Sequence, residues 1–167
     1  YDGFDGNQLD GTKWSISKLF GQTGSASVNN GFLTLRANSN PSSDLILMTG
    51  NSSFGPGNLL EVYARHSDAN GSGTNASELG FGNASRTNIL RILDYNSSKF
   101  IKNNTANNNG ENDYSNLMAH NLDNINFLLH KIYWKSNSEV DYAIGTDAFE
   151  PLTTNIPSVT LPPWLMC

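Results

Sequence analysis

Short runs of alternating apolar and polar residues, divided by Gly, Asn and Pro, recur along the whole chain. In residues 32–37, for example, Leu33 and Leu35 alternate with Thr34 and Arg36. A period of two puts one face of a strand on a core and the other in water. Runs this short and this often interrupted favour strands over helices, at the spacing typical of a β-sandwich or barrel. The predicted strands are residues 13–19, 32–37, 44–49, 59–65, 78–81, 89–94, 100–102, 127–135, 140–144 and 159–165.

Residues 116–129 carry the one competing helical pattern, with loosely spaced Leu and Ile side chains. Asn is abundant in and around this stretch and is a poor helix former. We therefore expect loop and strand there, and no helix.

The low content of charged residues excludes several partners. Charged side chains make up 15% of the chain and the net charge is −5, so nothing attracts nucleic acid or an anionic membrane. No apolar run approaches the roughly 20 residues of a membrane span. Cys167 is the only cysteine, which excludes an internal disulfide and leaves an unpaired thiol, or a bond between chains, as alternatives.

The start at Tyr1 fits a mature chain after signal removal, so we expect an extracellular or cell-surface protein. Chance supplies most of the N-glycosylation sequons in a chain this rich in Asn, Ser and Thr, although all lie in predicted loops. They are Asn51, Asn70, Asn75, Asn83, Asn96 and Asn103.

Segments spread over nearly the whole chain resemble, in order, the concanavalin A-like lectin and glucanase superfamily, which includes the LamG-like jelly rolls. They are Phe4-Asp5-Gly6, Asn30-Gly31-Phe32-Leu33-Thr34-Leu35, the stretch 54–65, Gly80-Phe81-Gly82, His130-Lys131-Ile132-Tyr133-Trp134 and Val140-Asp141-Tyr142-Ala143-Ile144-Gly145. The resemblance implies an all-β fold, a two-sheet antiparallel jelly-roll sandwich, as a single domain over residues 1–167. It also implies that Trp14 and Trp134 belong to the core.

The resemblance leaves one strand unaccounted for. In such domains a final strand follows a Pro-containing apolar segment, similar to residues 156–166 here, and pairs beside the opening strand. Either that strand lies outside the sequence given, or the sheet has an open edge there. An open edge is a template for a strand of another chain, which would build a homo-oligomer or polymer.

Hydrolases of this superfamily place E-x-D-x-x-E or E-x-D-x-E on one strand, where alternation puts the carboxylates on the same face. Glu61 and Glu78 have no such partners, and Glu139 and Asp141 flank a predicted hairpin. The three histidines lack zinc-ligand spacing. We therefore expect no catalytic residue and a protein that is not an enzyme.

These patterns favour a non-catalytic carbohydrate-binding domain whose partner is a polysaccharide or glycan. Aromatic rings stack on sugars and polar groups bind their hydroxyls. Glu61, Tyr63 and Arg65 share the outward face of one predicted strand, and Tyr95 follows another. A self-assembling extracellular structural subunit is the first alternative, and a glycoside hydrolase the second.

Calcium is the one predicted cofactor. Oxygen-bearing side chains at alternate positions before a Gly suit a hard cation, and the predicted ligands of this loop are Asp68, Asn70, Ser72, Thr74 and Glu78. An ordinary Gly-rich loop is the alternative. The resemblance implies a second site, near Asp2 and Gly31.

Calcium binding to the folded chain should raise its melting temperature by mass action. If the loop from Asp68 to Glu78 holds the ion, Asp68→Ala removes most of that increase. Differential scanning calorimetry with and without calcium measures both values. A full increase in the variant would assign the ion to the Asp2 and Gly31 end or elsewhere.

Overall fold

A computed structural model describes residues 3–18, 24–37, 46–65, 76–85, 87–95, 98–104, 113–116 and 127–167. This part of the chain is built from β-strands alone, as the alternating pattern predicts. The strands are β1 (Trp14–Lys18), β2 (Ser25–Asn29), β3 (Phe32–Arg36), β4 (Ile46–Gly50), β5 (Asn58–Ala64), β6 (Ala76–Gly82), β7 (Ile89–Tyr95), β8 (Ser98–Asn104), β9 (Asp113–Asn116), β10 (Leu128–Ser136), β11 (Glu139–Ile144), β12 (Glu150–Leu152) and β13 (Pro163–Met166).

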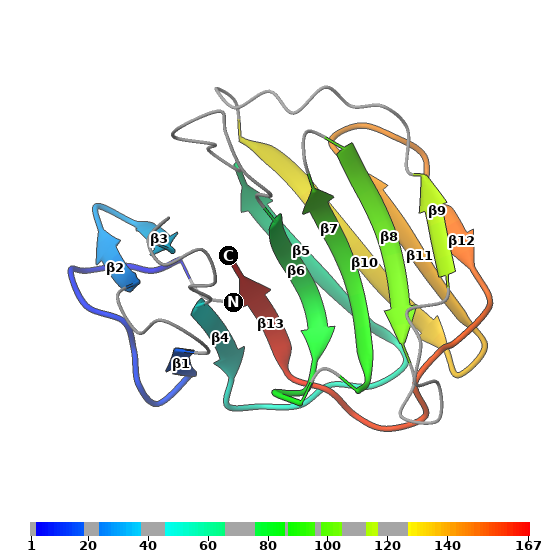
Figure 1. Ribbon diagram of the computed structural model, residues 1–167, viewed down its shortest axis with the longest axis horizontal. Coiled ribbons are helices and arrows are strands. Elements are labelled where there is room, and N and C mark those ends of the chain that lie inside the picture. Colours follow the sequence, from blue (N-terminus) through cyan, green and yellow to red (C-terminus); the bar gives the residue numbers. More distant parts are fainter. Residues whose placement is uncertain are drawn as a thin grey trace.

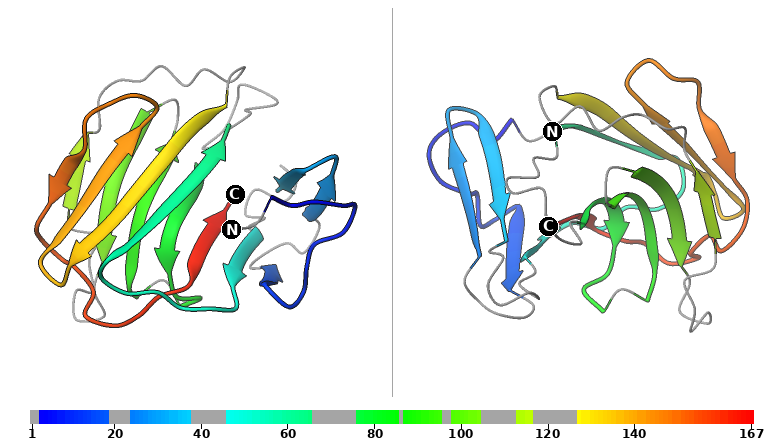
Figure 2. Two further views of the ribbon diagram at one scale, coloured as in Figure 1. Left: turned by 180° about the vertical axis from the view of Figure 1, so that it is seen from behind. Right: turned by 45° about the horizontal axis from the view of Figure 1, so that its top comes forward.

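The strands form two stacked antiparallel sheets and a separate hairpin. The larger sheet has the order β1-β4-β13-β6-β7-β8-β9, and the smaller sheet has the order β12-β11-β10-β5. Figure 1 shows β6, β7 and β8 in front of β5, β10 and β11, and Figure 2 shows the two layers from behind and from above. This is the two-sheet jelly-roll sandwich that the resemblance implies.

The hydrophobic core fills the space between the sheets. Leu79 and Phe81 on β6 meet Ile132 and Trp134 on β10, and the Phe81 and Trp134 rings lie 5.8 Å apart. Trp134 is fully buried, as predicted, whereas Trp14 is only half-buried. Burying such a side chain stabilises the fold by about 1.5–3 kcal/mol, so this cluster holds the layers together.

The hairpin of β2 and β3 lies beside the sandwich (Figure 1). Its two-residue turn has positive φ at both Asn30 (51°) and Gly31 (80°), the geometry of a type I′ turn. At its other end, a Cβ on Gly24 would lie 2.7 Å from the Arg36 backbone oxygen and 2.7 Å from Ile46 Cγ1, so a larger residue would require the backbone to shift. The sequence motif Asn-Gly thus marks a turn that the structure forms.

Every predicted strand overlaps an observed one, and three short strands were missed: β2, β9 and β12. Residues 117–126, most of the competing helical stretch, lie outside the described residues, and strands border them on both sides. Near the C-terminus, β13 lies between β4 and β6 and pairs with both. Among the described strands, β1 pairs with β4 alone. Pairing of β1 with a strand of another chain stays a prediction.

Gly80 is required by the close approach of β6 and β7. A Cβ at this position would overlap the Leu90 carbonyl oxygen and lie 2.8 Å from Arg91 Cα. We expect Gly80→Ala to lower the free energy of unfolding by at least about 2 kcal/mol, because both obstacles are backbone. Gly11→Ala is the matched control, since nothing lies within 4 Å of its Cβ position. Equal urea denaturation curves for the two variants would contradict the close approach.

Candidate functional site

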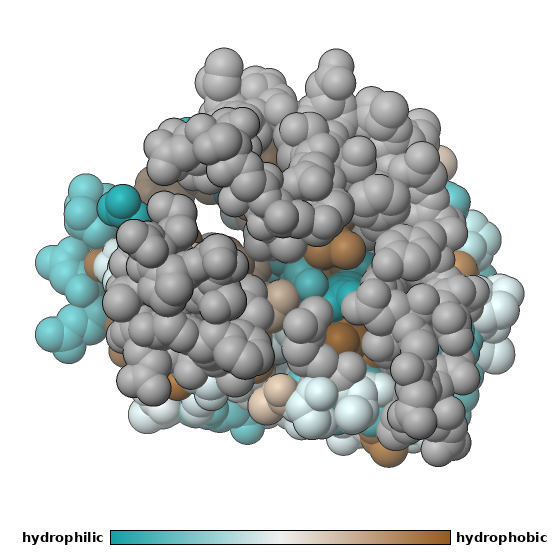
Figure 3. Space-filling view, in the orientation of Figure 1, coloured by the Kyte–Doolittle hydropathy of each residue, from teal (hydrophilic) through white to brown (hydrophobic). Residues whose placement is uncertain are grey.

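The larger sheet has an outer face that points away from the smaller sheet. Because strand residues alternate, Leu79 and Phe81 of β6 point into the core, and Glu78, Gly80 and Gly82 lie on the outer face. In the orientation of Figure 1, Figure 3 shows a recess near the middle of this side, where hydrophilic and hydrophobic atoms of described residues are visible between the grey ones.

A buried ion pair lies in the middle of this outer face. The Glu78 carboxylate accepts a hydrogen bond from the Arg91 guanidinium across the pairing of β6 with β7. The two residues are only 6% and 1% exposed. Removing both charges from water costs several kcal/mol per ion, which their attraction roughly offsets, so such a pair adds little net stability.

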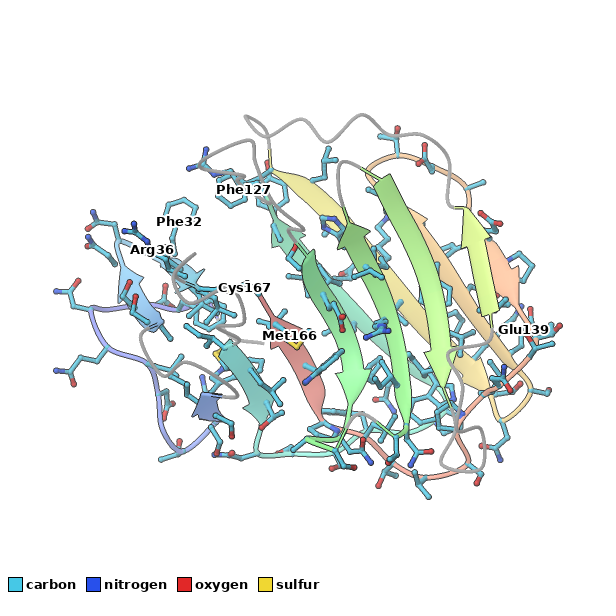
Figure 4. The ribbon with its side chains drawn as sticks, in the orientation of Figure 1. Phe32, Arg36, Phe127, Glu139, Met166 and Cys167 are labelled. Atoms are coloured by element: carbon cyan, nitrogen blue, oxygen red, sulfur yellow. The ribbon has the colours of Figure 1, made fainter. Side chains whose placement is uncertain are left out.

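Apolar side chains surround the pair. Leu47 of β4, Ile89 of β7, and Trp164 and Met166 of β13 form a second buried cluster, separate from the core. The Arg91 guanidinium carbon lies 6.0 Å from the centre of the Trp164 ring. Figure 4 labels Met166 on β13, next to β4 and β6. Together these residues form a buried apolar layer around one pair of charges on this side of the larger sheet.

The glycines of β6 decide how many carboxylates this strand offers. The hydrolase pattern E-x-D-x-E, laid on β6 from Glu78, finds Gly80 and Gly82 at the two later positions. Gly80 has no room for a side chain, and the Trp164 ring lies 3.2–3.4 Å from the Cβ position of Gly82. On β6, therefore, Glu78 is the single carboxylate of the outer face.

The structure brings together three of the four predicted glycan-binding residues. Glu61 and Tyr63 are exposed on β5 of the smaller sheet, and Arg65 follows that strand. Tyr95 ends β7 in the larger sheet, and its side chain lies outside the described part of the structure.

Sequence reasoning missed Phe127, which the structure places beside Tyr63. The Tyr63 and Phe127 rings stack, with 5.4 Å between their centres, and the Arg65 guanidinium carbon lies 5.1 Å from the Phe127 centre. Pairing of the two predicted strands would have indicated this contact, since Leu128, the residue after Phe127, pairs with Ala64, the residue after Tyr63.

The predicted calcium ligands are mostly beyond the described residues: Asp2, Asp68, Asn70, Ser72 and Thr74. Glu78, the last ligand of that loop, is paired with Arg91. At the second site, the Gly3 carbonyl oxygen lies 3.9 Å from the Cβ position of Gly31, so the opening segment passes the hairpin turn. Within the described residues no cluster of three His, Cys, Asp or Glu side chains forms. Both calcium sites stay predictions.

Glu139 and Asp141 lie on the smaller sheet, around Lys135. The Lys135 ammonium donates a hydrogen bond to Glu139 (2.6 Å) and lies 3.4 Å from Asp141. This partner lowers the pKa of Glu139, and the same hydrogen bond raises the pKa of Lys135. Figure 4 shows Glu139 at the right-hand end of the molecule and Met166, on β13 next to β6, near its middle, so Glu139 does not lie beside Glu78.

Comparison with known proteins identifies the fold. No family model matches the chain and no curated protein matches it. Among solved structures, the chain is similar to β-agarase A in complex with oligoagarose (TM-score 0.73, 12% identity, 99% of this chain and 78% of that one). It is also similar to the Bacillus licheniformis β-glucanase (0.70, 15%, 99% and 82%) and to an endo-acting O-glycanase of the human gut microbiota (0.74, 16%, 99% and 83%).

These likenesses confirm the concanavalin A-like jelly-roll fold. They contradict the expectation that the protein is not an enzyme, because the matched structures are glycan-degrading enzymes. That expectation rested on the missing carboxylate pattern of a single strand, and the fold matches over 99% of the chain regardless of it. The protein has a jelly-roll fold similar to that of the matched glycoside hydrolases.

The ion pair makes a stability prediction. Glu78→Gln leaves the Arg91 charge without its counter-charge and should lower the free energy of unfolding by about 3–5 kcal/mol. The double variant Glu78→Leu/Arg91→Met removes both charges and should come within about 1–2 kcal/mol of the wild type, or exceed it. Urea denaturation measures both. A double variant as unstable as the single one would mean that the two charges do not act as a pair.

Proposed function

We propose that this protein binds glycans across the outer face of the larger sheet, over β13, β6 and β7. The buried pair of Glu78 and Arg91 in the middle of that face carries the proposal. A carboxylate accepts hydrogen bonds from sugar hydroxyls, and a guanidinium donates to their oxygens. The Trp164 ring, itself fully buried, lies 6.0 Å from the Arg91 guanidinium carbon and helps to hold this group in place.

The comparisons support a glycan as the partner. The similar structures include an agarase holding oligoagarose, a β-glucanase and a mucin-degrading O-glycanase. Their likeness to this chain is one of fold, and a fold by itself does not assign a function. The ion pair adds a chemical reason to place the ligand on this face of the sandwich.

Cleavage of the bound glycan is the second candidate function. Glu78 favours it, because this residue is a carboxylate on the outer face of a strand in the larger sheet. Glycoside hydrolysis uses two carboxyl groups, about 5–5.5 Å apart with retention and about 6.5–9.5 Å apart with inversion. Since Gly80 and Gly82 take the other positions on β6, the second carboxyl group would come from another strand.

A glycan partner fits the extracellular or cell-surface location that we propose. None of the described segments is a helix of the length and hydrophobicity that a membrane crossing requires. Calcium bound near Gly31 or in the loop before Glu78 belongs to the same proposal, and its test is the calorimetric one given above.

Affinity electrophoresis through gels containing agarose, β-1,3-1,4-glucan or mucin tests the binding. We expect at least one polymer to retard the wild type. The variant Glu78→Leu/Arg91→Met should lose that retardation by about tenfold or more in apparent Kd, because it removes both polar groups and keeps the fold. Val159→Ala, an exposed apolar position elsewhere on the surface, is the control and should migrate as the wild type does.

Release of reducing sugar from the same polymers tests cleavage. Activity that the double variant lacks would establish hydrolysis through this face. Undiminished retardation of the double variant would exclude the outer face of the larger sheet as the binding site.

A further inference from the structure

Three exposed or half-buried aromatic side chains gather where β5 ends, β10 begins and the hairpin turns. Tyr63 is 67% exposed and Phe32 is 54% exposed, and half-buried Phe127 lies between them. We call Phe32, Tyr63, Phe127 and Arg65 the aromatic patch. Large aromatic side chains usually bury most of their surface, so a contiguous exposed group of them marks an interaction site.

Contacts among the rings hold the patch in one arrangement. Besides its stack with Tyr63, Phe127 contacts Phe32 with 5.5 Å between ring centres and an interplanar angle of 39°. Figure 4 shows Phe32, on the hairpin, and Phe127, at the start of β10, turned toward each other across the space between the hairpin and the smaller sheet. The rings are thus positioned before any ligand arrives, which lowers the entropy lost on binding.

The patch lies on a different surface from the Glu78 pair. Glu78 is on the outer face of the larger sheet, whereas Tyr63 is on the outer face of the smaller sheet, and the two outer faces point in opposite directions. One short ligand does not contact both.

The size and chemistry of the patch select its ligand. An aromatic side chain covers about 150–250 Å² in all, so three partly exposed rings offer much less than the roughly 800 Å² per partner of a stable protein interface. Polar groups flank the rings: Glu61 shares the outer face with Tyr63, and Arg65 lies over Phe127. Rings with hydrogen-bonding groups beside them suit a small amphipathic ligand such as a sugar ring.

We propose that the aromatic patch is a second glycan-binding site, on a different surface from the outer face of the larger sheet, and that one long glycan chain binds to both. This proposal rests on the proposed function only in taking a glycan as the ligand. Tyr63 and Phe32 stack on sugar rings, and Glu61 and Arg65 hydrogen-bond to hydroxyl groups. Since Phe32 belongs to the hairpin and Tyr63 to the smaller sheet, a bound chain of sugars joins the two parts.

Affinity electrophoresis through agarose, β-1,3-1,4-glucan and mucin gels tests the second site. Tyr63→Ala should weaken retardation about tenfold in apparent Kd, and Tyr63→Phe, which keeps the ring, should retain it. Val159→Ala, an exposed apolar position between β12 and β13, should again behave as the wild type. A glycan that retards the protein should also raise its melting temperature less in Phe32→Ala, because the hairpin no longer takes part.

The outcomes separate the two sites. Loss in Tyr63→Ala, with or without loss in Glu78→Leu/Arg91→Met, supports the patch. Normal retardation of Tyr63→Ala alongside loss in the double variant overturns the patch and leaves the proposed function standing. Loss in Tyr63→Ala alone overturns the outer face of the larger sheet instead. A wild type that none of the three polymers retards overturns both.

Discussion

The packing of Phe81 against Trp134 sits at the centre of the sandwich, and the positions of both candidate sites follow from it. Each ring belongs to a strand of a different sheet, so their contact sets which face of each sheet is inside. Alternation then sends Glu78 to one outer face and Tyr63 to the other. A slip of one residue in either strand would exchange core and surface along its whole length.

The two outer faces are both formed by alternate strand residues, but one carries a buried ion pair and the other carries exposed aromatic rings. On the larger sheet, β13 lies between β4 and β6, and Trp164 and Met166 join a second apolar cluster around the ion pair. In such apolar surroundings the attraction between the two charges is strong, so each side chain holds the other in place. On the smaller sheet the rings stand in solvent, and they are held by contacts between aromatic faces.

Much of the fold could be predicted, because alternation is local. The alternation of residues 32–37 and the turn at Asn30 and Gly31 follow from patterns within a few residues, and the resemblance implied the burial of Trp134. The strands missed are short, and β12 carries Pro151, which weakens a strand signal. The candidate sites were predicted less well. Glu61, Tyr63 and Arg65 are near neighbours in sequence, but Phe127 reaches them only through the pairing of β5 with β10.

The prediction that the protein is not an enzyme was contradicted. It rested on the carboxylate pattern expected on one strand, whereas the similarity to glycan-degrading enzymes extends over the whole fold. The sequence of a single strand does not determine which strands lie beside it in the sheet. The sequence by itself determined that this chain is all-β, since the period of two and the turn residues act within each strand, and the resemblance implied the sandwich. Tertiary structure alone decided that β13 lies between β4 and β6, that Arg91 meets Glu78, and that Phe32 meets Phe127. Those contacts join residues of different strands, and only the packing of complete sheets selects among the many pairings that local patterns allow.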